Sequence, residues 1–171
     1  MSDAISIRFE SRLLAPHERV WAWISSINGI AAELWPFLRM TSPKRVQSLA
    51  DVQVEPGVRL FRSYLLLFGV VPIDYSDMTL LELTLGIGFI EQSPMGSMTL
   101  WRHERHIAPC PSAPDAVLLV DQLTLQPRLA RRLTGWFVRH LFAHRHKVLS
   151  DNLDGAEQGA PVDVSASRPR R

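Results

Sequence analysis

The chain has one cysteine among its 171 residues, Cys110, and therefore cannot form an internal disulfide. So little cysteine fits a reducing compartment, and we expect the protein to be cytoplasmic. Long apolar runs are missing too. The longest candidate, Tyr64 to Ile73, is shorter than the ~18 residues that a membrane-spanning helix needs, and the N-terminus lacks the pattern of a secretory signal.

A strong excess of charge of one sign is also absent. The formal net charge is +2, which is too small to indicate nucleic-acid binding. Basic residues do gather toward the C-terminal end of the chain, at Arg128, Arg131, Arg132, Arg139, Arg145 and Lys147. They predict either a solvated helix face or a weak contact with an anionic membrane surface. The oligomeric state stays open.

Several motifs of enzymes and cofactor sites are missing. The sequence has no phosphate-binding loop, no dinucleotide fingerprint and no Gly-x-Ser-x-Gly nucleophile motif. His140 and His144 stand one helical turn apart, a spacing that zinc could use. The text there is HLFAH rather than HExxH, and no good third ligand stands out. We therefore expect neither a metal nor another cofactor.

The first part of the chain predicts a strand followed by two short helices. Ile5 to Leu13 alternates apolar and polar residues, which is typical of a half-buried strand. Pro16 is well placed to open a helix. We expect Asn28 and Gly29 to break that helix before a second short one over 30–35.

The stretch from 44 to 126 consists of short β-rich runs separated by turn residues. We expect strands near 45–53, 58–68, 76–85, 86–93, 97–108 and 115–126. Short connections between successive strands favour an antiparallel meander. The apolar segment YLLLFGVVPI predicts either a central strand with a buried turn or a lip over a cavity.

The last element has helical periodicity over about 128–153. One broad stripe holds Leu129, Leu133, Trp136, Phe137, His140, Leu141, His144 and Val148, and we expect it to face the sheet. His146 lies off this stripe and is expected to meet solvent. Residues 154–171 lack apolar periodicity, which predicts a disordered tail after one domain over 1–153.

This order of elements predicts an α+β fold. An antiparallel sheet of seven strands has one face that must be covered. The C-terminal helix is the element long enough to do so, because 26 residues at 1.5 Å each span roughly 39 Å. We expect a curved sheet wrapped around this helix, with two short helices after the first strand.

Three stretches resemble the START-like, helix-grip superfamily, which includes polyketide cyclases and lipid-binding relatives. FESRLLAPHERVWAWI resembles its opening strand and helix, and FIEQSPMGSMTLWRHERHI its paired strands with a W-x-H pattern. VLLVDQLTLQP, followed by LFAHRHKVL, resembles its last strand and closing helix. The resemblance covers about residues 4–153. It implies the helix-grip fold and a cavity for an apolar or amphipathic molecule, which some members carry or sense and others convert.

One histidine and one aspartate are candidates for a buried pair. Trp101 and His103 share one face of the strand expected over 97–108, and the family pattern implies that this face points inward. If the next loop closes a hairpin, His103 comes near Asp121, an acid in an otherwise apolar row. The pair would satisfy two buried polar groups, contact a ligand or transfer a proton.

We therefore hypothesise that the chain carries or senses a hydrophobic or amphipathic small molecule, such as a lipid or a polyketide-like compound. The alternative is an enzyme of the cyclase or dehydratase type that uses His103 and Asp121. A third reading is an interaction protein whose cavity is filled by side chains. The candidate ligand-binding residues are Tyr64, Leu66, Phe89, Trp101, His103, Leu119, Asp121, Leu133, Trp136, Phe137 and His140.

Overall fold

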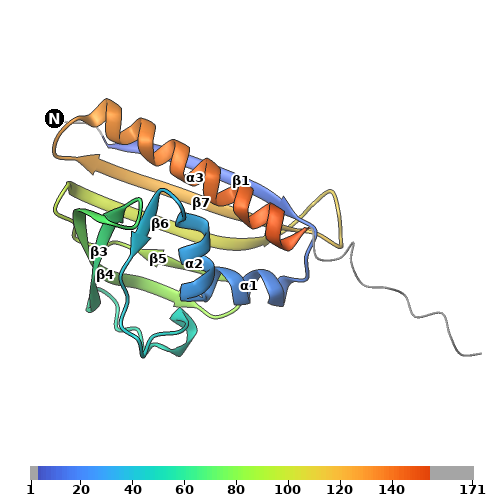
Figure 1. Ribbon diagram of the computed structural model, residues 1–171. Helices are drawn as coiled ribbons and strands as arrows, with labels where there is room; N and C mark the ends of the chain where they lie inside the picture. The colour runs from blue at the N-terminus through green and yellow to red at the C-terminus, as the bar shows by residue number, and fades with distance from the viewer. Residues whose placement is uncertain (1–3, 155–171) are drawn as a thin grey trace, which may run out of the picture.

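A computed structural model describes residues 4–154, which form seven strands, three α-helices and one 3-10 helix (Figure 1). In chain order these are β1 (Ile5–Leu13), α1 (His17–Ser25), α2 (Ile27–Leu34), β2 (Leu38–Met40), η1 (Leu49–Asp51), β3 (Arg59–Leu67), β4 (Val71–Thr84), β5 (Gly88–Glu91), β6 (Met98–Pro109), β7 (Val117–Pro127) and α3 (Arg131–Leu153). Of the tail predicted over 154–171, residues 155–171 lie outside the described residues.

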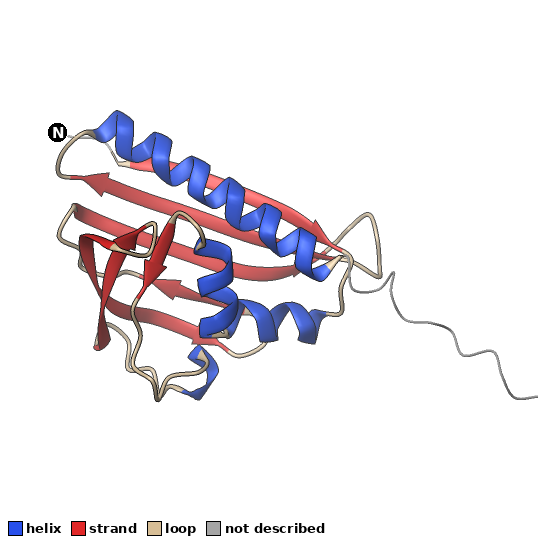
Figure 2. Cartoon of the chain, viewed as in Figure 1, coloured by secondary structure: helices blue, strands red, loops and turns tan. Residues whose placement is uncertain are grey.

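The strands form one antiparallel sheet in the order β1-β7-β6-β5-β4-β3-β2 (Figure 2). Strands β2 to β7 are a meander in which each strand pairs with the next, and β1 adds to the free edge of β7. The β1–β7 ladder runs without a bulge from Ile5 opposite Leu125 to Leu13 opposite Val117. The predicted α+β helix-grip architecture is confirmed.

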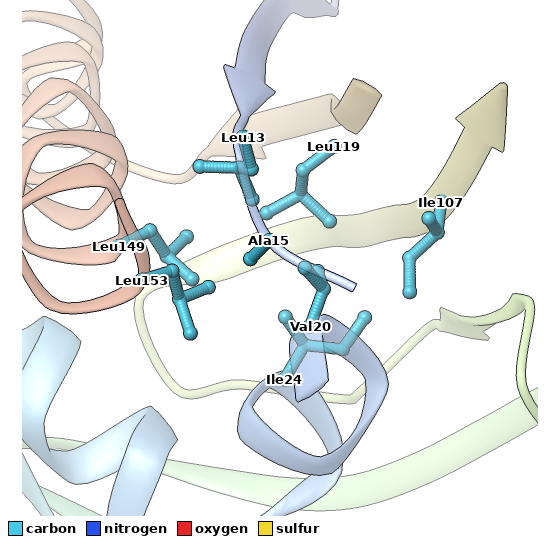
Figure 3. Close-up of a cluster of buried hydrophobic side chains, with 8 residues drawn as sticks. All are labelled: Leu13, Ala15, Val20, Ile24, Ile107, Leu119, Leu149 and Leu153. Carbon is cyan, nitrogen blue, oxygen red and sulfur yellow. The ribbon is translucent and has the colours of Figure 1, made fainter. Parts of the chain in front are cut away.

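The helices cover one face of this sheet. Helix α3 runs along β1 and β7, and α2 packs against α3 (Figure 1). Near the C-terminal end of α3, side chains from β1, α1, β6, β7 and α3 meet in an apolar cluster (Figure 3). Its buried members are Leu13, Ala15, Val20, Ile24, Ile107, Leu119, Leu149 and Leu153. This cluster closes one end of the space between the helix and the sheet.

The prediction of a strand over 45–53 is wrong. That stretch is a loop with the short helix η1, and Ser48 caps the helix by accepting a hydrogen bond from the Ala50 N–H at 3.1 Å. The edge strand lies earlier, where Leu38–Met40 pairs with Leu65–Leu67 of β3. A strand of three residues is too short to show a clear alternation of apolar and polar side chains, so the sequence pattern does not reveal it.

The expected helix break at Asn28 and Gly29 is also misplaced. The chain turns at Ser26, whose hydroxyl caps α2 by accepting from the Gly29 N–H at 2.8 Å. Gly29 lies inside α2, and a Cβ there would come within 2.3 Å of the Trp23 carbonyl oxygen. The glycine therefore allows α1 and α2 to approach each other.

The buried face of α3 is rotated from the predicted stripe. Phe142 and Leu149 face the core, whereas Leu133 and Trp136 are 64% and 55% exposed. His146, expected in solvent, is buried. Apolar residues in the N-terminal half of α3, such as Leu133, Trp136 and Phe137, line a cavity, described below, instead of packing in the core. Hydrophobic periodicity alone does not distinguish cavity-lining residues from core residues.

The rotation of α3 about its axis, which buries Phe142, leads to a stability prediction. Phe142→Ala should lower the free energy of unfolding by about 3–5 kcal/mol, because removing this fully buried ring leaves a void. Phe137→Ala should cost less than half as much, since Phe137 is only half-buried. Urea unfolding of both variants measures the difference. Equal losses would show that the helix is turned differently.

Candidate functional site

A cavity of about 470 Å³ lies between the sheet and the helices. This volume is within the roughly 300–1,000 Å³ typical of small-molecule sites. Its wall is mostly apolar and draws on α2, β3, β4, β6 and α3, as with Leu34, Leu65, Leu80, Trp101 and Phe137. On the strands, inward-facing positions carry leucine and aromatic side chains at a period of two, which places Leu65, Leu80 and Trp101 in the wall.

Two pairs of polar residues interrupt this apolar wall. Glu91 of β5 and His103 of β6 face each other across their ladder, and Ser63 of β3 and Ser76 of β4 do the same in theirs. Glu91 is held by the Ser93 hydroxyl, which donates to its Oε1 at 2.6 Å. All of these side chains are buried.

His103 is fixed from behind by Asp121. The distance from His103 Nε2 to Asp121 Oδ1 is 2.8 Å, so the predicted pair is present. The rings of Phe89 and Phe142 also pack edge-on against the imidazole. The other ring nitrogen, Nδ1, lies 3.8 Å from Glu91 Oε2, on the side of the cavity.

Asp121 accepts hydrogen bonds from three side chains. Besides His103, Arg105 donates from Nε and Nη2 at 2.7 and 2.8 Å, and His146 Nε2 lies at 2.9 Å. Burial alone would raise the pKa of Asp121, but Arg105 and His103 hold that pKa well below its usual range. An ionised carboxylate accepts but cannot donate, so both histidines donate through Nε2. The Nδ1 atom of His146 is then free to accept from the Ser11 hydroxyl at 2.7 Å.

Arg105 links Asp121 to a second buried acid, Glu33 of α2. Its Nη1 donates to both Glu33 oxygens, at 3.1 and 2.9 Å, and Arg145 of α3 donates to Glu33 Oε2 at 2.9 Å. Burial opposes the charge of Arg105, yet Asp121 and Glu33 raise its pKa; burial and nearby Arg105 lower the pKa of Arg145. Two carboxylates and two guanidiniums balance, and we call Glu33, Arg105, Asp121 and Arg145 the buried charge cluster.

The model of a domain of unknown function, DUF8410, matches residues 11–153. The chain belongs to this family. No curated protein matches the DUF8410 chain.

Solved structures share the fold of this DUF8410 domain at low sequence identity. Protein CV1439 from Chromobacterium violaceum is 18% identical, with a TM-score of 0.62 over 87% of this chain and 96% of that one. A START superfamily protein from Mycobacterium smegmatis is 12% identical, with a TM-score of 0.60 over 91% and 99%. The Zhui aromatase/cyclase from Streptomyces sp. R1128 is 11% identical, with a TM-score of 0.62 over 92% and 98%. These likenesses establish a START-like fold for the chain, as its sequence resemblance implied.

Six of the eleven candidate ligand-binding residues line the cavity of this DUF8410 domain. They are Phe89, Trp101, His103, Leu133, Trp136 and Phe137. The high exposure of Leu133 and Trp136 puts both side chains at the mouth. That these residues contact a ligand stays a prediction.

The other five candidates, Tyr64, Leu66, Leu119, Asp121 and His140, lie away from the cavity wall. Tyr64 and Leu66 point outward, because alternate residues of β3 such as Leu65 take the inward face. Leu119 belongs to the closed apolar end, and Asp121 lies behind His103. His140 is exposed and contacts the Trp136 carbonyl one turn back, at 2.8 Å.

The sequence reasoning missed Glu33, Glu91 and the two serines. Glu91 ends a strand of four residues, Ser63 stands in a strand with no clear alternation, and Glu33 meets Arg105 across 72 positions of sequence. Arg145, expected on a solvated face, is buried. A polar residue at an inward-facing position of a mostly apolar strand is a signal for a site. That signal could be used for β3, β4 and β5 only once it was known which of their residues face inward.

Two further expectations concern metals and membranes. Within residues 4–154, no group of three or more histidine, cysteine or acidic residues is arranged to hold a metal ion. His144 Nε2 lies 2.7 Å from the Trp35 carbonyl oxygen. None of the helices in the described part of the chain is long and apolar enough to cross a bilayer. A weak contact with an anionic membrane surface stays a prediction.

The buried charge cluster predicts a large cost for Asp121→Asn. Removing this charge should lower the free energy of unfolding at pH 7 by about 3–5 kcal/mol, because Arg105 then keeps only Glu33 as a charged partner. Asp77→Asn is the control, since Asp77 pairs with the half-exposed Arg62 at the surface, and its loss should be much smaller. Urea unfolding compares the two variants. Equal losses would contradict the role of the cluster.

The same carboxylate predicts how stability depends on pH. The pKa of Asp121 is lower in the folded protein than the value of about 3.9 in an unfolded chain, so its contribution is complete above that value. It is lost as the pH falls toward the folded pKa. Wild-type protein should therefore lose stability below about pH 4–5, and Asp121→Asn should lose less over the same range. Urea unfolding at a series of pH values measures this. If the free energies of unfolding of the two proteins fell in parallel with pH, the lowered pKa of Asp121 would not be the cause.

Proposed function

We propose that this protein binds a hydrophobic or amphipathic small molecule, such as a lipid or a polyketide-like compound, in the cavity and carries or senses it. The observation that supports this most is an apolar space of about 470 Å³ that side chains do not fill. Apolar walls that face a void lose their packing contacts, and a bound molecule restores them. This also disfavours the reading in which side chains fill the cavity.

The composition of the wall fits such a ligand. Small-molecule sites combine many apolar contacts with a few well-placed polar groups. Here the polar groups include Glu91, His103, Ser63 and Ser76. Asp121 acts on a ligand only by holding His103, because its own oxygens already accept hydrogen bonds from Arg105 and two histidines.

An enzyme remains the second candidate, favoured by the Glu91–His103 pair. One acid and one imidazole meet at the cavity wall, which is what general acid–base catalysis needs. In such an enzyme the partner of His103 toward the substrate would be Glu91, since Asp121 lies behind the ring. Fold does not choose between the two functions, because the same architecture serves a protein described as an aromatase/cyclase.

A matched pair of substitutions tests binding in the cavity. Leu65 lines it and the neighbouring Leu66 does not. Leu65→Trp should weaken binding of the neutral fluorescent probe N-phenyl-naphthylamine about tenfold, because the larger ring occupies the ligand's space. Leu66→Trp should bind the probe as wild type does. Thermal unfolding of each variant checks that the sheet is intact, and equal probe binding by the two variants would contradict the proposal.

Proton exchange separates a carrier from an acid–base enzyme. A carrier should leave the methyl protons of bound 2-acetylnaphthalene unexchanged in deuterated buffer, beyond the rate in buffer alone. NMR follows the loss of the methyl signal. Faster exchange with wild type that disappears in Glu91→Gln and His103→Gln would overturn the carrier reading in favour of the enzyme.

A further inference from the structure

The serine pair, Ser63 and Ser76, is distinctive among the buried polar groups. The two residues face each other across the β3–β4 ladder, are 0% and 2% exposed, and line the cavity. Within residues 4–154, neither hydroxyl has a hydrogen-bond partner. A buried hydroxyl without a partner destabilises a protein by about 1–3 kcal/mol.

Other buried serines of this chain do have partners. The Ser25 hydroxyl donates to the Trp21 carbonyl at 2.8 Å, and the Ser93 hydroxyl donates to Glu91 at 2.6 Å. The serine pair therefore departs from the rule that buried polar groups are satisfied. Both of its hydroxyls border the space that the proposed ligand occupies, so a ligand atom can supply the missing partner.

The charges around the cavity restrict the chemistry of that atom. The charged side chains that line it, among the described residues, include two acids, Asp74 and Glu91, and one base, Arg145. Arg145 is already bound to Glu33. A ligand carboxylate at the serine pair would be buried near Asp74, which is two residues from Ser76 on β4, without a cation to offset its charge. Two hydroxyl donors suit a neutral oxygen better.

The serine pair is separate from the Glu91–His103 pair. Glu91 lies opposite Leu80, which is four residues along β4 from Ser76. At ~3.3 Å per residue, this is roughly 13 Å of strand. The serines therefore contact a different part of a ligand than the imidazole does.

Building on the proposed function, we propose that Ser63 and Ser76 form a subsite for a neutral carbonyl or hydroxyl oxygen of a largely apolar ligand, and that the cavity disfavours carboxylates. A fatty-acid anion is then a poor ligand. An apolar ketone, phenol or alcohol is a good one, with the serine hydroxyls donating to its oxygen.

Three naphthalene derivatives of similar size test this subsite through displacement of N-phenyl-naphthylamine. They are 2-acetylnaphthalene, which has a neutral carbonyl, 2-ethylnaphthalene, which has none, and the anion 2-naphthoate. Wild type should bind the ketone about threefold to tenfold more tightly than the hydrocarbon, as expected for one or two hydrogen bonds. Naphthoate should bind more weakly than the ketone.

The double variant Ser63→Ala/Ser76→Ala gives the decisive comparison. It should lose the preference for the ketone, bind the hydrocarbon at least as well as wild type, and melt at the same or a higher temperature, because two unsatisfied hydroxyls are gone. Ser25→Ala is the control: it removes a satisfied buried hydroxyl outside the cavity, so it should melt lower and keep the preference.

Other outcomes overturn the subsite. These are a ketone preference that survives in the double variant, no preference in wild type, naphthoate binding as tight as that of the ketone, or a lower melting temperature of the double variant. If wild type binds N-phenyl-naphthylamine but shows no preference, the subsite fails and the proposed function stands. If wild type binds neither the probe nor any naphthalene, the proposed function fails as well.

Discussion

A single buried arginine sets the arrangement of this molecule. Arg105 is 0% exposed and carries its charge between Glu33 of α2 and Asp121 of β7. A charge this deep is tolerated only with partners, and losing one partner costs more than the complete pair contributes. Because those partners come from different elements, the arginine requires α2, β6 and β7 to meet in one geometry. Arg145 adds α3 to the same contact.

This cluster divides the space under α3 into three zones. At the C-terminal end of the helix, Leu149 packs against Leu119 of β7 in the closed apolar cluster. In the middle, Arg145 and Asp121 belong to the charge cluster. Toward the N-terminal end, Phe137 faces the cavity. The polar middle zone thus lies between a packed core and an open one, and His103 extends from it to the cavity wall.

Much of the fold could be predicted from the sequence, because the long strands and the long helix have clear periods. The His103–Asp121 pair could be predicted as well, since parity and a short loop bring the two rows together once the family resemblance has implied that His103 points inward. Which residues of β3 face the cavity could not be predicted. Leu65, Leu66 and Leu67 are all apolar, so no alternation distinguishes the two faces of the strand there. The face of α3 was misread because Leu133 and Trp136, at the cavity mouth, look like core residues. The partnership of Glu33 with Arg105 is a long-range contact that no local pattern encodes.

We propose that the cavity under α3 holds a neutral, largely apolar molecule. Native mass spectrometry of the protein purified from cells, followed by solvent extraction and identification of any bound compound, tests it most directly. We expect a non-covalent complex with one small molecule per chain, apolar over most of its surface and bearing a neutral carbonyl or hydroxyl oxygen. A bound fatty-acid anion, or a chain that carries nothing and takes up no such molecule when it is supplied, would contradict it.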